Sequence, residues 1–160
     1  MKFIHITDLH LVPEGELLWG LSPVDRFQQC LDDLARHHAD AAFVAISGDL
    51  TERGDIASYE LLRDRLKRFP LQTHLMLGNH DDRGNFAHVF GGADAQGFVQ
   101  HAISVRGTRF LFLDTLKGGQ SSAGLYDEPR RDWLRRELSG GSETVIFMHH
   151  PPFPIHHPLM

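Results

Sequence analysis

Residues 75–84, LMLGNHDDRG, join a short apolar run to a group of polar side chains that can bind a metal ion. The leucine and methionine residues at the start are typical of a buried strand. Gly, Asn and Asp are also ordinary turn residues, so the stretch fits either a polar turn or part of a metal site. The residues directly after the other apolar runs of the chain decide between the two interpretations.

Length and composition predict one globular domain spanning residues 1–160. The chain is 41% hydrophobic, which suffices for a core in a domain that buries roughly 70% of its unfolded surface. A net charge of -5 without a run of like charges disfavours binding to a nucleic-acid duplex. The lone Cys30 favours a reducing compartment. With no signal peptide at the start and no apolar run near the ~20 residues of a membrane span, we expect a cytoplasmic protein away from the membrane.

Apolar runs alternate with amphipathic stretches, and this alternation predicts an α/β fold. Helices are expected at 23–37, 56–68, 86–90 and 127–138. Runs of strand length lie at 2–7, 41–47, 73–77, 98–105, 108–114 and 143–148. Arg106 and Gly107 predict a tight turn that pairs 98–105 with 108–114 antiparallel. The early strands should be mostly parallel and covered by helices.

Metal-ligating side chains directly follow four of these strands. In chain order they are Asp8 and His10, then Asp49, then Asn79 and His80, and finally His149 and His150. Ligands of an open α/β sheet bind outside the carboxyl ends of its strands, so these residues are expected to converge there. On an extended segment Asp8 and His10 would point the same way, with Leu9 turned into the core. Gly48 and Gly78 would let the chain turn sharply as it leaves the sheet.

Several nitrogen and oxygen ligands at one point suit the hydrolysis of a phosphoester. Two divalent ions about 3.5 to 4 Å apart neutralise phosphate oxygens and lower the pKa of bound water. A carboxylate has two oxygens and can bridge such a pair of ions. Asp49 is the candidate bridge, because it stands alone after its strand, between the other contributors. Carboxylate, amide and imidazole ligands without thiolate suit Mn, Fe or Zn.

These motifs resemble those of the calcineurin-like metallophosphoesterases. SGDLTERG (47–54), GNHDDRG (78–84), LFLDT (111–115) and FMHHPPFP (147–154) are similar to motifs of class III cyclic-nucleotide phosphodiesterases and related glycerophosphodiesterases. The resemblance covers essentially the whole chain and implies an αββα sandwich.

The same resemblance implies a role for each site residue. Asp8, His10 and Asp49 would hold a first divalent ion. Asp49, Asn79 and His149 would hold a second. His80 would lie near the leaving group, as a proton donor or as a charge that stabilises the departing alkoxide.

The chain departs from the family pattern after FMHHPPFP. Family members carry a later Gly-His-x-His segment that supplies one more histidine to each metal, together with the second half of the sandwich. Neither occurs in this sequence. The resemblance therefore implies a fold that is incomplete at the C-terminus and metal sites that are each one ligand short. An uncovered sheet edge also predicts a homo-oligomer.

Other polar and aromatic residues keep two interpretations each. His150 is either a ligand or a hydrogen-bonding partner behind the ligands, and Asp81 is favoured as a turn or cap residue over a ligand. Trp19 either lines a substrate cleft or packs over the first helix.

Arg53 and Arg83 either contact phosphate or are solvated loop charges, and the second interpretation is favoured. His156 and His157 either replace the absent histidines or have no role in the site, and the second is favoured because this C-terminal stretch has no strand to direct their side chains.

The sequence thus predicts a binuclear metal-dependent phosphodiesterase acting on small diesters such as 3',5'-cyclic nucleotides or glycerophosphodiesters. A protein phosphatase is an alternative, because GDLTERG is similar to the phosphatase pattern GD-x-x-(D/E)RG. A nuclease of the same superfamily is another, although a nuclease should carry a basic groove. A non-catalytic metal-binding or interaction module is the third. GNHDD and HHPP favour the phosphodiesterase.

Overall fold

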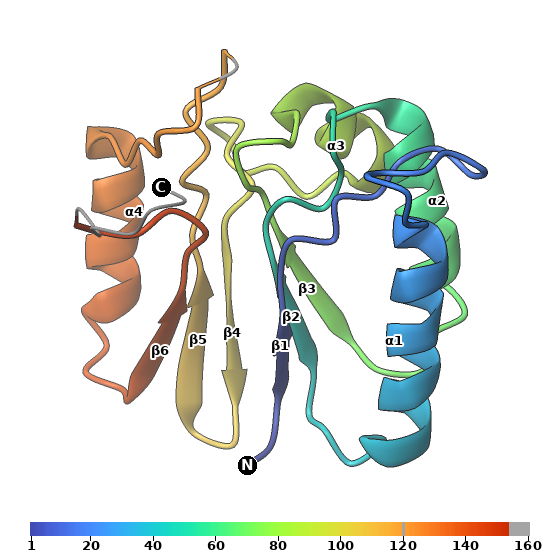
Figure 1. Cartoon of the computed structure of the whole chain (residues 1–160). Helices are drawn as coiled ribbons and strands as arrows, with labels where there is room; N and C mark the ends of the chain where they lie inside the picture. Colours follow the sequence, from blue (N-terminus) through green and yellow to red (C-terminus); the bar gives the residue numbers. More distant parts are fainter. Residues whose placement is uncertain (120, 154–160) are drawn as a thin grey trace.

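A parallel sheet forms the first half of the molecule. The computed structural model describes residues 1–119 and 121–153. Strands β1 (Ile4–Ile6), β2 (Val44–Ser47) and β3 (Thr73–Met76) pair in parallel in the order β1-β2-β3 (Figure 1). All of β2 is buried, as the central strand of a parallel sheet covered on both faces should be.

Helices α1 (Pro23–His37) and α2 (Ile56–Leu66) cover the outer face of this sheet (Figure 1). Each begins at a side chain that caps its first turn: Ser22 accepts a hydrogen bond from the Asp25 amide, and Asp55 accepts one from the Ser58 amide. Capping satisfies amide groups that have no partner within the helix. The apolar faces of the helices pack on alternate residues of β2 in one buried cluster, which includes Phe27, Leu31, Leu34, Val44, Ile46, Tyr59 and Leu62.

The second sheet is mixed. Strands β4 (His101–Val105) and β5 (Thr108–Phe112) are antiparallel, and β6 (Thr144–Phe147) pairs in parallel with β5. Arg106 and Gly107 join the first two strands and both have positive φ, which is the backbone of a tight two-residue hairpin turn. Helix α4 (Glu128–Leu138) lies on the outer side of this sheet (Figure 1).

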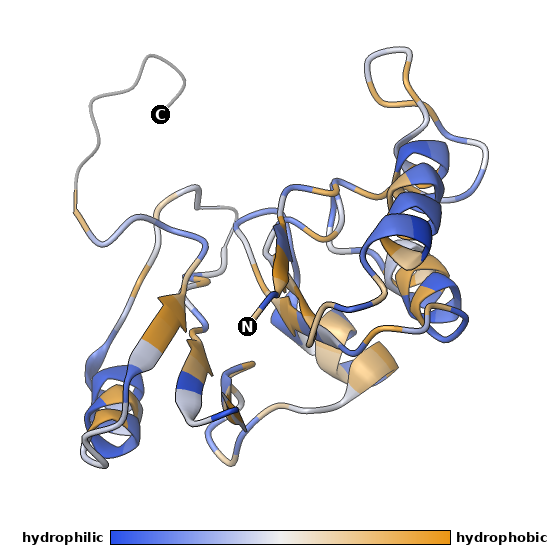
Figure 2. Ribbon diagram, turned by 90° about the horizontal axis from the view of Figure 1, so that it is seen from below, coloured by the Kyte–Doolittle hydropathy of each residue, from blue (hydrophilic) through white to orange (hydrophobic). Residues whose placement is uncertain are grey.

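Aromatic side chains fill the space between the two sheets. Phe43, Ala45 and Met76 of the first sheet region share a buried cluster with Phe110, Phe112 and Phe147 of the second. The strands of both sheets are mostly hydrophobic, whereas the helices alternate between hydrophobic and hydrophilic residues (Figure 2). The layers therefore run helix, sheet, sheet, helix, and the predicted αββα sandwich is confirmed. The expected absence of its second half is wrong, because β4, β5 and β6 form a second sheet that α4 covers (Figure 1).

Two predicted details differ from the structure. The four ligand-bearing strands do not share one sheet, because β6 buries Phe147 against the first sheet and takes β5 as its partner. Helix α3 (Arg83–Phe90) begins three residues before the predicted start, because the Asp82 carboxylate caps it by accepting from the Asn85 amide.

Two further expectations concern the surroundings of the domain. Within residues 1–119 and 121–153, no helix is long and apolar enough to cross a membrane. Strand β6 lies at one edge of its sheet, and Ile146 on this strand is 39% exposed. Such an edge can pair with another chain, and the homo-oligomer stays a prediction.

Candidate metal centre

The loops that leave β1 and β2 run side by side beyond the ends of the strands. The Asp8 amide donates to the Gly48 carbonyl over 3.1 Å, and the His10 amide donates to the Asp49 carbonyl over 2.9 Å. These bonds continue the parallel pairing past the last residues of both strands. Asp8 and His10 are thereby held next to Asp49.

The backbone at this point is left-handed. Asp8, His10 and Asp49 have φ values of 57°, 45° and 47°, in a region that non-glycine residues visit rarely and in which Asp and His are enriched. The expectation of an extended segment through Asp8 and His10 is therefore wrong, because β1 ends at Ile6. Leu9 nevertheless packs against the core as expected. Strained backbone of this kind gathers at functional sites.

A first cluster of ligand atoms forms around Asp8, His10 and Asp49. His10 Nε2 lies 3.8 Å from Asp8 Oδ1 and 3.6 Å from Asp49 Oδ2. These separations are too long for good hydrogen bonds. They are near the roughly 3.4 Å between two ligand atoms of a tetrahedral ion with bonds of about 2.1 Å.

A second cluster forms around Asp49, Asn79 and His149. His149 Nε2 lies 3.5 Å from Asp49 Oδ1 and 3.2 Å from Asn79 Oδ1. Asp8 also approaches this cluster, within 4.8 Å of the ligand atoms of Asp49 and His149. His149 comes from the loop after β6, so this cluster takes ligands from both sheets.

Each histidine turns a lone pair toward its cluster. His10 Nδ1 donates to Glu52 Oε2 over 2.8 Å, and His149 Nδ1 donates to the Ser47 carbonyl over 2.9 Å. In the neutral ring the other nitrogen, Nε2, then carries no proton. In this tautomer the Nε2 lone pairs face carboxylate or amide oxygens in both clusters, and a cation between them would bind both kinds of atom. The donor sets therefore fit two divalent ions.

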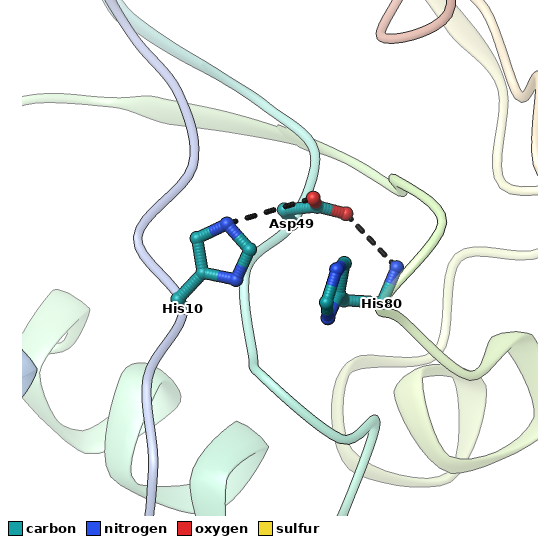
Figure 3. Close-up of side chains that lie close together, drawn as sticks. All are labelled: His10, Asp49 and His80. Atoms are coloured by element: carbon teal, nitrogen blue, oxygen red, sulfur yellow. Dashed lines mark hydrogen bonds and ion pairs between the residues drawn. The ribbon is translucent and has the colours of Figure 1, made fainter. Parts of the chain in front are cut away.

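Asp49 lies between the two clusters. Its side chain is only 6% exposed, with Oδ2 toward His10 and Oδ1 toward His149. The His80 amide donates to Oδ1 over 2.9 Å, which fixes the carboxylate in place (Figure 3). This geometry is the one expected of a bridging carboxylate.

The comparison with known proteins identifies the family. Residues 1–159 match the calcineurin-like phosphoesterase family. The chain belongs to this family.

Several curated relatives of this phosphoesterase domain are phosphodiesterases by name. A probable cyclic nucleotide phosphodiesterase from Rhodopseudomonas palustris is 36% identical over 96% of the chain and 58% of its own length. A glycerophosphodiester phosphodiesterase from Enterobacter lignolyticus is 34% identical over 97% of the chain and 58% of its own length. A cAMP/cGMP dual specificity phosphodiesterase from Mycobacterium tuberculosis is 28% identical over 94% of the chain and 50% of its own length. The chain thus spans between half and three fifths of the length of these relatives.

In this phosphoesterase domain His80 lies beside the first cluster. Its ring meets the His10 ring edge-on, with centroids 4.8 Å apart, and its Nδ1 donates to the Glu52 carbonyl over 3.0 Å (Figure 3). Burial lowers the pKa of His80, but the Glu52 carbonyl and the carboxylates of Asp49, Glu52 and Asp81 outweigh burial and raise this pKa above its ordinary value. Since Nδ1 is engaged, Nε2 is the nitrogen left for a substrate.

Glu52 is the residue of the site that sequence reasoning missed. Its Oε2 accepts from His10 and lies 3.7 Å from His80 Nδ1. Carboxylates behind a ligating histidine orient the ring and raise its basicity. The only signal in the sequence is the place of Glu52 three residues after Asp49, on the same loop.

Asp81 and His150 form hydrogen bonds with neighbouring loops. The buried Asp81 carboxylate accepts hydrogen bonds from three amides and two hydroxyls, those of Leu50, Thr51 and Gly78 and those of Thr51 and Tyr59. It therefore ties the loop after β2 to the loop after β3. His150 Nδ1 lies 2.7 Å from Thr115 Oγ1, which agrees with a hydrogen-bonding role.

The surroundings of Arg83 and Trp19 differ from those that the sequence favoured. Arg83 is not a solvated loop charge, because it forms a partly buried ion pair with Asp114. Trp19 is 85% exposed, so packing over the first helix is wrong. Arg53 is solvated as favoured, in an exposed pair with Glu16, and His156 and His157 lie outside the described residues.

Gly78 leaves space that a larger residue would fill. A Cβ atom at this position would lie 2.2 Å from Asp49 Oδ1 and 2.7 Å from His149 Nε2. At Gly48 a Cβ atom would lie 2.4 Å from His149 Nδ1. The ligands can converge only because both positions lack a side chain.

We predict that Gly78→Ala weakens Mn²⁺ binding by ~10-fold or more, because the methyl group displaces Asp49 and His149. Isothermal titration calorimetry measures the affinity. Gly140→Ala is the matched control, since nothing lies within 4 Å of a Cβ atom there. Equal Mn²⁺ affinity of Gly78→Ala and the control would contradict this description of the centre.

Proposed function

We propose that this domain is a binuclear metal-dependent phosphodiesterase for small phosphodiesters, such as 3',5'-cyclic nucleotides or glycerophosphodiesters. One observation carries the proposal: the two oxygens of Asp49 face two separate clusters of nitrogen and oxygen ligand atoms. Family membership and the names of the relatives support it.

We propose which residues would hold each ion. Asp8, His10 and Asp49 would hold the first ion, and Asp49, Asn79 and His149 the second. Two such ions, when bound, supply positive charge to the phosphate and activate water at neutral pH. Mn, Fe and Zn all suit carboxylate, amide and imidazole donors.

The remaining chemistry belongs to side chains of this chain. Glu52 keeps His10 in the tautomer that offers Nε2, and the Ser47 carbonyl does the same for His149. His80 lies next to the ligands with its Nδ1 hydrogen-bonded to the Glu52 carbonyl, and its raised pKa favours the protonated ring. We propose that His80 donates a proton to the departing alkoxide, or stabilises its charge.

The proposal predicts that activity depends on metal and on Asp49. Chelator should abolish hydrolysis of bis-p-nitrophenyl phosphate, and Mn, Fe or Zn should restore it. Asp49→Ala should lower the rate more than Asp8→Ala or Asn79→Ala, because only Asp49 serves both ions. Asp40→Ala is the control, as Asp40 is an exposed carboxylate paired with Lys2. A rate close to wild type for Asp49→Ala would refute the two-metal proposal.

The role of His80 predicts a dependence on the leaving group. His80→Ala should slow hydrolysis of a diester with an alkoxide leaving group by about 10² to 10⁴-fold, the usual range for general acid-base catalysis. With p-nitrophenolate, which departs without a proton, the loss should be much smaller. Metal content, measured by mass spectrometry, should not change.

His88→Ala is the control for this comparison, because His88 is exposed on α3. If His80→Ala slowed both substrates equally, His80 would have a structural role only.

A further inference from the structure

The two ligand clusters differ in how they depend on the fold. The first takes all its ligands from loops of the first sheet, after β1 and β2. The second combines Asp49 and Asn79, from loops of the first sheet, with His149, which follows β6 of the second. Only the second cluster therefore changes if the two sheets shift against each other.

A partly buried ion pair links the two sheets. Arg83 is the first residue of α3 and lies four residues after Asn79. Its Nε donates to Asp114 Oδ2 over 2.8 Å, and its Nη2 donates to Asp114 Oδ1 over 2.9 Å. Asp114 follows β5 and its side chain is fully buried. The two-point contact fixes orientation as well as distance.

A second contact continues from Asp114 to the ligand. Thr115 is the next residue, and its Oγ1 lies 2.7 Å from Nδ1 of the buried His150. The His150 amide also donates to this hydroxyl, over 3.4 Å. His150 directly follows His149. Polar contacts thus run from the Asn79 loop through Arg83, Asp114 and Thr115 to the His149 loop.

Further contacts hold the middle of this path. Asp114 accepts from the amides of Val99 and Leu116. Arg130, only 2% exposed, donates to the carbonyls of Asp114 and Leu116 over 3.1 and 3.0 Å. A buried charge pair is weak evidence for stability, since removing water from both ions costs free energy. What this network does supply is one fixed geometry between the sheets.

We propose that Asp114 and Arg83 are positioning residues that set His149 against Asn79 and thereby determine the affinity of the second metal site alone. The inference rests on the proposed two-metal function. It adds that the affinities of the two sites can be changed separately. The first site lies within the first sheet region, whereas the second depends on the contact between the two sheets.

Metal titration of the whole chain tests the inference. In Asp114→Asn and in Arg83→Gln, calorimetry with Mn²⁺ should show the second binding step weakened by ~10-fold, as is typical when partners behind the ligands are lost, and the first step unchanged. The double variant should match the single ones, because they remove the same contact. Asp132→Asn is the control: Asp132 is an exposed carboxylate on α4 that pairs with Arg135, outside the contacts around Asp114.

A second readout needs no metal. In ¹⁵N-labelled, metal-free protein, the ring nitrogens of His149 report the hydrogen bond from Nδ1 to the Ser47 carbonyl. Asp114→Asn should shift the His149 signals and leave those of His10 unchanged, whereas Asp132→Asn should leave both unchanged. If Asp114→Asn does not fold, Arg83→Lys replaces it, since Lys keeps the charge but loses the two-point contact.

The outcomes separate the two proposals. Equal loss at both metal sites, no loss at either, or the same effect from Asp132→Asn would overturn the positioning role. Failure of the unmodified chain to bind a second ion would refute the two-metal function, and the His149 signals would then decide the positioning role by themselves.

Discussion

The arrangement of this site depends on the Asp49 carboxylate and the two directions in which its oxygens point. A buried carboxylate is costly unless its oxygens find partners, and the Asp49 side chain is 6% exposed. One hydrogen bond comes from the His80 amide, and histidine nitrogens that face it from either side carry no proton in the neutral ring. Two cations, as proposed above, would satisfy these acceptors. The neighbouring glycines and the left-handed backbone at Asp49 allow each carboxylate oxygen to face one of the two clusters.

Other buried carboxylates hold the loops around Asp49. Asp81 collects donors from the loops after β2 and β3, so these loops keep their spacing within the first sheet. Asp114 accepts hydrogen bonds from the Arg83 side chain and from the amides of Val99 and Leu116. Glu52 sets the ring of His10. Ligand positions on loops are thereby fixed by charges placed behind them, as preorganised sites require.

Much of the fold follows from periodicity and local signals in the sequence. The alternation of apolar runs with amphipathic helices predicts the elements in their order, and the Arg106-Gly107 turn predicts the hairpin. The location of ligands after strands is also predictable, because parallel strands bring their carboxyl ends together. The partner of β6 is not, since any short apolar run can pair with several strands.

The details of the site are less accessible from sequence. Asp8-x-His10 fits extended alternation as well as it fits two left-handed residues, and only the pairing with the loop after β2 distinguishes the two conformations. Glu52 lies in a loop and Arg83 at the first position of α3, and at both positions a solvated charge is the ordinary expectation. Their partners, His10 and Asp114, are 42 and 31 residues away in sequence. Such long-range polar pairs leave no periodic pattern.

The central claim is that Asp49 bridges two ions. The most direct measurement is a crystal structure of the chain soaked with Mn²⁺, with anomalous diffraction recorded at the manganese edge. A bridging Asp49 predicts two anomalous peaks about 3.5 to 4 Å apart, one on Oδ2 with Asp8 and His10 and one on Oδ1 with Asn79 and His149. A single peak on Asp49, or peaks that do not touch both of its oxygens, would contradict the bridge.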